Sequence, residues 1–285
     1  MLHRILSPEV ISRLPTPKGV ALALTKACQG EDVHLDTIAG LVRTDPALSG
    51  RLLALANSAA SGGRALASVD EAIARMGIST VNQVALAFSL IDQYSEGHCT
   101  NFNYAGFWNQ SLLMAAASQR LGTLRKLGPA SELFTVGLLA QIGSLALATV
   151  FPKEYSDVVV TDVGRLGRLE LEEAKFSINH LALSIALMEH WGIPSEYARP
   201  FGLHEEGTTE QFNPYVKQKE RAQLSHAAWL VAGALSNEGM DALFDDDECV
   251  ESLAWLELSR EAMQEQLTEI EAVWQVWLAL ITRPG

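Results

Sequence analysis

Apolar residues recur every three or four positions through most of the chain, which is the spacing of amphipathic helices. In the segment 46–58, PALSGRLLALANS, three leucines fall on one helical face: Leu48, Leu52 and Leu55. One run of β-branched residues, Val158 to Thr161, could form a strand, and we interpret it as the end of a helix. The pattern therefore predicts an all-α fold, a compact bundle of many helices joined by short links.

Residue types that begin and end helices punctuate these apolar runs. Ser68 with Glu71 three residues later forms a capping box, and Gly77 suits the left-handed position that ends the same helix. Asp45 followed by Pro46 predicts another helix start, because Asp is a good N-cap and Pro is tolerated in the first turn.

Asn57 and Ser58 lie where the helix that begins at Pro46 is expected to end. Hydrogen bonds from polar side chains to nearby backbone groups explain such residues at a helix end. Asn57 directly follows the apolar run LLALA, so it should be partly buried, and a buried amide must be hydrogen-bonded. We therefore predict that Asn57 is a structural polar residue that joins the two halves of the chain.

The polar, weakly periodic segment from Ser95 to Gly106 predicts a boundary. Residues 1–96 are expected to form an N-terminal helical subdomain, and residues 97–285 a second helical subdomain. The second ends in an amphipathic helix whose apolar residues step by four and three for fewer than three heptads. Such a short seam favours packing on its own domain, with Trp274 and Trp277 as apolar anchors.

Composition favours a soluble, cytoplasmic protein. The chain has 285 residues, 48% of them hydrophobic, which is enough for one large core or two smaller ones. No uninterrupted apolar stretch has the length of a membrane span, and the N-terminus MLHRILSPEV lacks the pattern of a signal peptide. Three widely spaced cysteines indicate packing residues in a reducing compartment: Cys28, Cys99 and Cys249.

The formal charge of −13 is concentrated in the second part of the chain. Residues 1–90 carry 8 Lys/Arg and 7 Asp/Glu, whereas residues 91–285 carry 13 and 27. An acidic surface repels phosphates, so we expect neither nucleic acid nor an anionic membrane as a partner. The acidic run from Asp245 to Glu251 lacks the ligand spacing and central glycine of a calcium loop, and we interpret it as a solvated loop.

Local motifs give little support for catalysis. The chain contains no GxSxG, HExxH or phosphate-loop motif. Four histidines lie in its second half: His180, His190, His204 and His226. His180 and His190 would lie about 80° apart around one helix, so they do not form a facing pair. Each histidine by itself is most simply explained as a capped, packed or exposed side chain.

The order of several motifs resembles that of HDOD domains, the HD-related output domains of bacterial signalling proteins. The N-terminal part of the resemblance rests on LPTPKGVALAL, IAGLVRTDPALSGRLLALANSA and SVDEAIARMGISTVNQVAL. It continues through FWNQSLLMAAA, FTVGLLAQIG, HLALSIALMEHWGIP and LHEE, and thus covers about residues 8–280. The resemblance implies an HDOD-like multi-helix bundle in which an N-terminal helical subdomain packs on an HD-like helical subdomain.

The second half of that family is similar to HD-type metal phosphohydrolases. Their ligands are a His on an early helix, a His-Asp pair on the next, further histidines and a late Asp. The resemblance maps this ligand set onto seven positions of the chain: Gln110, Ala140, Gln141, His180, His204, Glu205 and Trp229.

Most of these positions no longer carry a metal ligand. Gln110 stands for the early His, Ala140 and Gln141 stand for the His-Asp pair, and Trp229 stands for the late Asp. Two histidines remain, and two neutral imidazoles without a bridging carboxylate cannot hold a binuclear centre. The resemblance therefore implies the fold, but we predict no metal, no cofactor and no catalytic residue.

The resulting hypothesis is a pseudoenzyme, a non-catalytic signalling and regulatory module that acts through protein–protein interaction. The expected partner is a signalling protein from a receptor, kinase or cyclase pathway, and a homodimer is compatible with this role. Two alternatives stay open. One is a residual or altered metal-dependent phosphohydrolase that uses the remaining polar residues of the site, which must then converge. The other is a module that binds a nucleotide or another small ligand in the vacated pocket.

Overall fold

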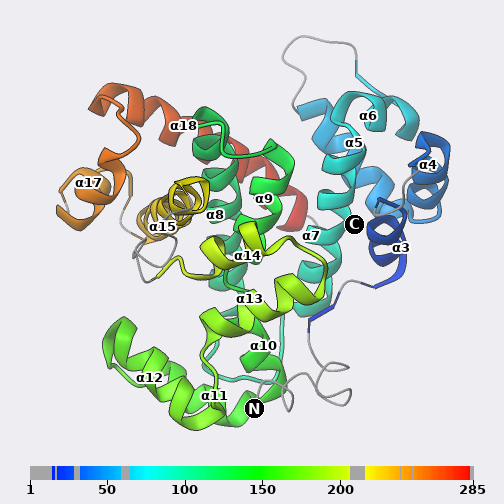
Figure 1. Cartoon of the computed structure of the whole chain (residues 1–285). Coiled ribbons are helices and arrows are strands. Elements are labelled where there is room, and N and C mark those ends of the chain that lie inside the picture. The colour runs from blue at the N-terminus through cyan, green and yellow to red at the C-terminus, as the bar shows by residue number, and fades with distance from the viewer. Residues whose placement is uncertain are drawn as a thin grey trace. The chain divides into compact units, whose positions relative to one another are not determined.

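A computed structural model describes residues 15–16, 18–28, 33–58, 65–205, 216–237, 239–245 and 247–282 of the chain. All regular secondary structure in these ranges is helical, which confirms the predicted all-α fold. Figure 1 shows the arrangement of the helices. In chain order they are α3 (Gly19–Cys28), α4 (Leu35–Arg43), α5 (Pro46–Ser58), α6 (Val69–Met76), α7 (Ile78–Tyr94), α8 (Tyr104–Leu124), α9 (Ala130–Leu139), α10 (Ile142–Val150), α11 (Pro152–Val159), α12 (Gly164–Phe176), α13 (His180–His190), α14 (Ser195–Gly202), α15 (Val216–Asn237), α16 (Ala242–Asp245), α17 (Asp247–Ala254) and α18 (Arg260–Thr282).

The helices belong to two compact units. The first unit contains Thr16–Tyr94 together with Ala272–Gly285, and the second unit contains Ser95–Glu271. The division after Tyr94 lies close to the predicted boundary after residue 96. The end of the chain differs from the prediction, which assigned all of residues 97–285 to one subdomain. Helix α18 begins in the second unit and ends in the first.

Helix α7 forms the centre of the first unit. Val84 and Leu90 on α7 are fully buried, and α3, α5 and α6 all pack against this helix. The ring of Trp277, near the end of α18, lies 5.6 Å from the ring of Phe88 on α7. This apolar contact explains why the last residues of the chain group with the first unit. Trp274, the other predicted anchor, is only half-buried.

The structure confirms two predicted helix starts in the first unit, those at Asp45 and Ser68. Asp45 caps α5, because its Oδ1 accepts a hydrogen bond of 3.0 Å from the backbone N–H of Leu48. Ser68 caps α6 in the same way, with Oγ accepting from the N–H of Glu71 at 3.1 Å. Gly77 follows α6 with φ +82° and ψ 151°. The positive φ requires glycine, but the ψ lies outside the left-handed helical region that the sequence predicted.

Asn57 is hydrogen-bonded, as predicted, but its partner lies in the same unit. Its Nδ2 donates to the carbonyl of Leu66 at 3.0 Å, and its Oδ1 accepts from the N–H of Leu66 at 2.7 Å. The side chain therefore holds the end of α5 to the segment before α6 and does not join the two halves of the chain through these bonds. Ser58 ends α5, and its side chain lies outside the described residues.

The second unit is built around helices whose backbones approach closely. Helix α8 packs against both α9 and α15, and α10 packs against α13. A Cβ on Gly137 of α9 would lie 2.9 Å from the Cα of Ala115 on α8, and a Cβ on Gly143 of α10 would lie 2.0 Å from the carbonyl oxygen of His180 on α13. Glycine is therefore required at both crossings. The run from Val158 is the end of α11, as predicted.

The segment Ala130–Val150, which contains α9 and α10, is long and apolar enough to cross a membrane. In the folded chain, however, 83% of its most apolar window is buried inside the protein. These two helices thus supply the interior of the second unit, and their composition reflects a close-packed core.

Candidate functional site

A tight turn between α12 and α13 brings two side chains of opposite charge together. After Phe176, the last residue of α12, Ser177 adopts a left-handed conformation with φ +60°. Asn179 then caps α13, and its side-chain oxygen accepts a backbone hydrogen bond of 2.9 Å within the first turn. The turn places Glu172, on α12, beside His180, the first residue of α13.

The carboxylate of Glu172 is fully buried and fully hydrogen-bonded. Its Oε2 lies 2.6 Å from Nδ1 of His180 and accepts the backbone N–H of the same residue at 2.8 Å. Its Oε1 accepts from Nε of Arg168 at 3.2 Å and from the hydroxyl of Tyr155 at 3.1 Å. A negative charge at the N-terminus of α13 is also favoured by the helix dipole.

His180 is a buried imidazolium. Its Nε2 lies 3.2 Å from Oε1 of Glu205, so a carboxylate faces each ring nitrogen and both nitrogens donate. Burial lowers the pKa of His180, but the hydrogen bonds to Glu172 and Glu205 outweigh burial and raise it to about 9. Together with Arg168, these residues form a charged cluster. Its two cations are His180 and Arg168, its two anions are Glu172 and Glu205, and its net charge is zero.

The other members of the cluster have pKa values that preserve this charge pattern. Burial alone would raise the pKa of Glu172 and of Glu205, but the hydrogen bonds with His180 lower both, that of Glu205 to about 2. Burial raises the pKa of Tyr155, which therefore stays a neutral phenol that donates to Glu172 and accepts from Nη2 of Arg168 at 2.6 Å. At neutral pH the whole network is consequently fixed in one protonation state.

His204 differs from His180 in charge and in bonding. It is fully buried, and burial lowers its pKa to about 4, so the ring is neutral at pH 7. Its Nδ1 donates to the carbonyl of Phe201 at 3.1 Å. Its Nε2 lies 4.0 Å from Oε1 of Glu205 and has no hydrogen-bond partner within the described part of the chain.

Trp229 packs against two histidines, His204 and His226. Its ring stacks on His226 with centroids 5.8 Å apart and lies 6.3 Å from the ring of His204. The guanidinium carbon of Arg165 lies 5.1 Å from the same indole ring, a cation–π geometry. His226 also bonds to the neighbouring backbone, because its Nδ1 donates to the carbonyl of His204 at 2.7 Å.

The residues that stand for the His-Asp pair lie at the junction of α9 and α10. Ala140 and Gln141 are both buried. The amide nitrogen of Gln141 lies 3.7 Å from the sulfur of Met114, which is a weak acceptor. Gln110 is half-buried on α8. Within the described ranges, neither glutamine forms a hydrogen bond or ion pair with the cluster around His180.

The structure thus brings together four of the seven mapped positions: His180, His204, Glu205 and Trp229. The binuclear metal centre that the resemblance implies for the family does not fit these side chains. Gln141 supplies no bridging carboxylate, and both ring nitrogens of His180 are hydrogen-bonded to carboxylates. In the part of the chain that the structure describes, no group of three or more His, Cys, Asp or Glu residues is arranged to hold a metal ion.

Sequence reasoning missed Glu172, Arg168 and Tyr155, the partners that fix His180. One signal was available, because Arg168 and Glu172 lie four residues apart and can pair on one helical face. The same segment, RLELEE, offers three glutamates, and the helical pattern does not tell which of them is buried.

The fold and this site define a helical protein of the HD-like type. The family model for the HDOD domain matches residues 14–206 of the chain. The chain therefore belongs to the HDOD domain family.

Several solved structures share the fold. The MmoQ response regulator of Methylococcus capsulatus str. Bath is 31% identical, with a TM-score of 0.55, and the match covers 89% of this chain and 97% of that one. A protein of Shewanella amazonensis SB2B, named as a candidate phosphohydrolase, is 19% identical with a TM-score of 0.75, over 96% and 97%. An HDOD domain protein with unknown function from Geobacter sulfurreducens is 20% identical with a TM-score of 0.67, over 96% and 95%.

One curated relative also matches, an uncharacterized protein of Treponema pallidum (strain Nichols) that is 22% identical over 218 residues. The match covers 72% of this chain but only 40% of the relative's length.

Proposed function

We propose that this chain is a non-catalytic regulatory module that acts by binding a signalling protein. The observation that carries the proposal is the bonding of His180, whose two ring nitrogens both face carboxylates. A protonated imidazole has no lone pair to offer a metal ion, and metal ligation requires the neutral ring. The site is then a structural ion-pair network at the position where the family's metal-binding relatives place their ligands.

Two further observations support a regulatory role in the cytoplasm. A relative that is 31% identical carries the name response regulator. The segment Ala130–Val150, which is long and apolar enough to cross a membrane, is mostly buried within the fold. We infer that the partner is a component of a receptor, kinase or cyclase pathway, and that a homodimer is one form in which the module could meet it.

An altered metal-dependent phosphohydrolase is the second candidate, and the bonding of His204 favours it. Its Nε2 is buried without a partner in the described residues and faces Glu205, which also contacts His180. The residues that the sequence left as ligands therefore converge, as this alternative requires. For His180 to join them, however, it must release a proton that Glu172 and Glu205 both stabilise.

Metal analysis combined with a turnover assay separates the two candidates. The purified chain is incubated with Zn²⁺, Mn²⁺ or Fe²⁺, desalted, and assayed for bound metal and for hydrolysis of bis-p-nitrophenyl phosphate and cyclic dinucleotides. The regulatory module predicts substoichiometric metal and no turnover. Stoichiometric metal with turnover that His180→Ala abolishes would establish the hydrolase instead. His190→Gln is the matched control, because His190 lies on the same helix but is exposed.

Affinity capture from the native cell tests the interaction. The expected result is a signalling protein that is retained by the full chain and binds again when both proteins are pure. Capture of chaperones alone, or loss of binding on purification, contradicts the proposed role.

A further inference from the structure

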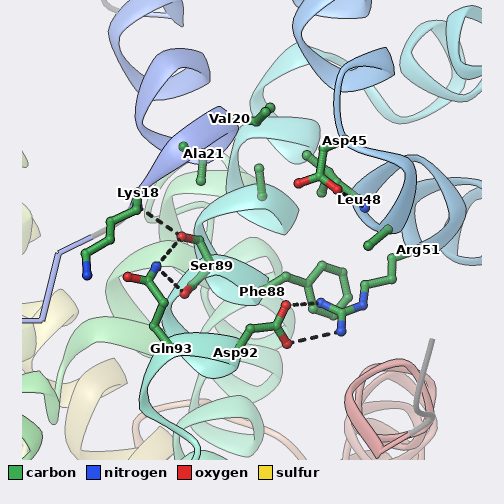
Figure 2. Close-up of a pocket in the computed structure, with 13 residues that line it drawn as sticks. Lys18, Val20, Ala21, Asp45, Leu48, Arg51, Phe88, Ser89, Asp92 and Gln93 are labelled. Atoms are coloured by element: carbon green, nitrogen blue, oxygen red, sulfur yellow. Dashed lines mark hydrogen bonds and ion pairs between the residues drawn. The ribbon is translucent and has the colours of Figure 1, made fainter.

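The first unit contains a cavity of about 410 Å³ bordered by α3, α5 and α7. Its lining includes apolar side chains from all three helices, among them Ala21 of α3, Leu48 of α5 and Phe88 of α7, which are labelled in Figure 2. Ala21, Leu48 and Phe88 are all buried. The volume falls within the range of about 300–1,000 Å³ that is typical of small-molecule sites.

Internal bonds hold part of the rim in place. Arg51 forms a bidentate ion pair with Asp92, at 2.6 and 3.1 Å, and its guanidinium carbon lies 4.4 Å from the centre of the Phe88 ring. Ser89 accepts hydrogen bonds from the backbone N–H of Lys18 at 3.1 Å and from the amide of Gln93 at 2.8 Å. These bonds, drawn as dashed lines in Figure 2, pre-order the rim before any ligand enters.

Other polar groups at the rim have no partner within the described residues. Asp45 uses one carboxylate oxygen to cap α5, and its second oxygen has no hydrogen bond or ion pair within the described residues. The ammonium group of Lys18 has none either, and it stands directly before the N-terminus of α3, where the helix dipole favours an anion. The cavity thus offers one cation and one carboxylate oxygen that have no partner within the described residues.

We propose that this cavity binds a small zwitterion with a large apolar body, of which an apolar amino acid is the simplest example. The apolar body packs against Leu48 and Phe88. The carboxylate lies toward Lys18 and the start of α3, and the ammonium group lies toward the free carboxylate oxygen of Asp45 on the opposite rim. The cavity is lined by two cations and two anions, namely Lys18, Arg51, Asp45 and Asp92. This balance of charge favours a ligand of zero net charge. The inference does not depend on the proposed function, because every lining residue belongs to the first unit.

Three probes that share one apolar body test the charge requirement by titration calorimetry on the full chain. L-Phenylalanine carries both charges, 2-phenylethylamine lacks the carboxylate, and 3-phenylpropionate lacks the ammonium group. Partly exposed ion pairs are weak, so each truncated probe should bind about three- to fivefold more weakly than L-phenylalanine. L-Leucine and L-tryptophan extend the series to other apolar bodies.

Two variants assign the charges. Lys18→Met should abolish the preference for L-phenylalanine over 2-phenylethylamine, and Asp45→Asn should abolish the preference over 3-phenylpropionate. Asn replaces Asp as an N-cap with little loss, so α5 stays capped. Lys26→Met and Asp36→Asn are matched controls at exposed positions of α3 and α4, and should bind like the unmodified chain.

Several outcomes overturn the proposal. They are the absence of heat for all three amino acids at millimolar concentration, equal binding of a singly charged probe and L-phenylalanine, and unchanged preferences in both Lys18→Met and Asp45→Asn. A thermal melt of each variant confirms that a lost preference does not come from unfolding.

Discussion

Two ion pairs of this chain, one in each unit, differ sharply in burial. In the second unit, Glu172 and His180 are removed from solvent almost completely, at 0% and 1% exposure, and every polar atom of the carboxylate is bonded. In the first unit, Arg51 and Asp92 form an equally well-aligned pair, but their side chains are 20% and 52% exposed. The N···O distances of the two ion pairs are therefore similar, but their contributions to stability should differ because their burial differs.

Burial decides what happens when one partner is removed. A buried charge that loses its partner keeps its desolvation cost, so breaking such a pair is strongly destabilising. An exposed charge regains water, and exposed pairs typically contribute less than about 1 kcal/mol. The buried network is consequently suited to fixing the turn between α12 and α13, whereas the exposed pair contributes little to the stability of the fold.

The largest effect is expected from Glu172→Gln. The substitution leaves His180 buried without one of its two carboxylates and removes the carboxylate partner of the half-buried Arg168. It should lower the free energy of unfolding by about 3–5 kcal/mol. Urea denaturation followed by circular dichroism measures this loss. Glu173→Gln is the matched control, because Glu173 is the exposed neighbour on the same helix and its removal should change the stability by less than about 0.5 kcal/mol. A loss of similar size in both variants would show that the network does not stabilise the fold.

Alkaline pH should weaken the second unit through His180. The pKa of this group rises from 6.5 to about 9 on folding, so the folded state holds the proton more tightly than the unfolded state. Its contribution is complete below about pH 6.5 and is lost as the pH rises through about 9, and the total is about 3 kcal/mol. Denaturation midpoints measured between pH 7 and 10 should fall accordingly.

The variant His180→Gln separates this effect from the titration of other groups. It removes the only imidazole between Glu172 and Glu205, so the slope of stability against pH in this window should become shallower, whatever the absolute stability of the variant. An unchanged slope would mean that His180 is neutral in the folded chain.

The sequence predicts those features that depend on residues within one helical turn, and it does not predict those that depend on contacts between helices. The caps at Asp45 and Ser68 follow from residue types within one helical turn, and both were predicted correctly. The pairing of Glu172 with His180 depends on where α13 lies against α12, which no local pattern encodes. Likewise the sequence predicted the helix that contains Trp277, but the tertiary contact with Phe88 determines the unit to which its end belongs.

The mapped site shows the same limit. The resemblance located His180, His204, Glu205 and Trp229, and the structure brings these four together. It could not supply the protonation state of His180, because that state is set by Glu172, a residue outside the mapped ligand set. The sequence thus shows which metal ligands of the family are missing from this chain. The hydrogen bonds that His180 makes in their absence can be learned only from the structure.

An intermediate effect is expected from a methyl group placed where the second unit is most tightly packed. In Gly143→Ala the new Cβ would lie 2.0 Å from the carbonyl oxygen of His180, so α10 and α13 must separate, at a cost of about 1–3 kcal/mol. Gly50→Ala tests the first unit in the same way, but nothing lies within 4 Å of its Cβ. There the helix propensity of Ala should stabilise α5 by about 0.5–1 kcal/mol. Thermal melts of the two variants should shift in opposite directions.

The smallest effect concerns the exposed pair of the first unit. A double-mutant cycle with Arg51→Met, Asp92→Asn and the combined variant isolates the coupling between the two side chains. The coupling should be less than about 1 kcal/mol and should decrease further in 0.5 M NaCl, because salt screens exposed charges. Arg51→Met should cost more than Asp92→Asn, since Arg51 also packs its guanidinium over Phe88. A salt-insensitive coupling above about 2 kcal/mol would contradict the contrast, because a pair of that strength would behave energetically like the buried network.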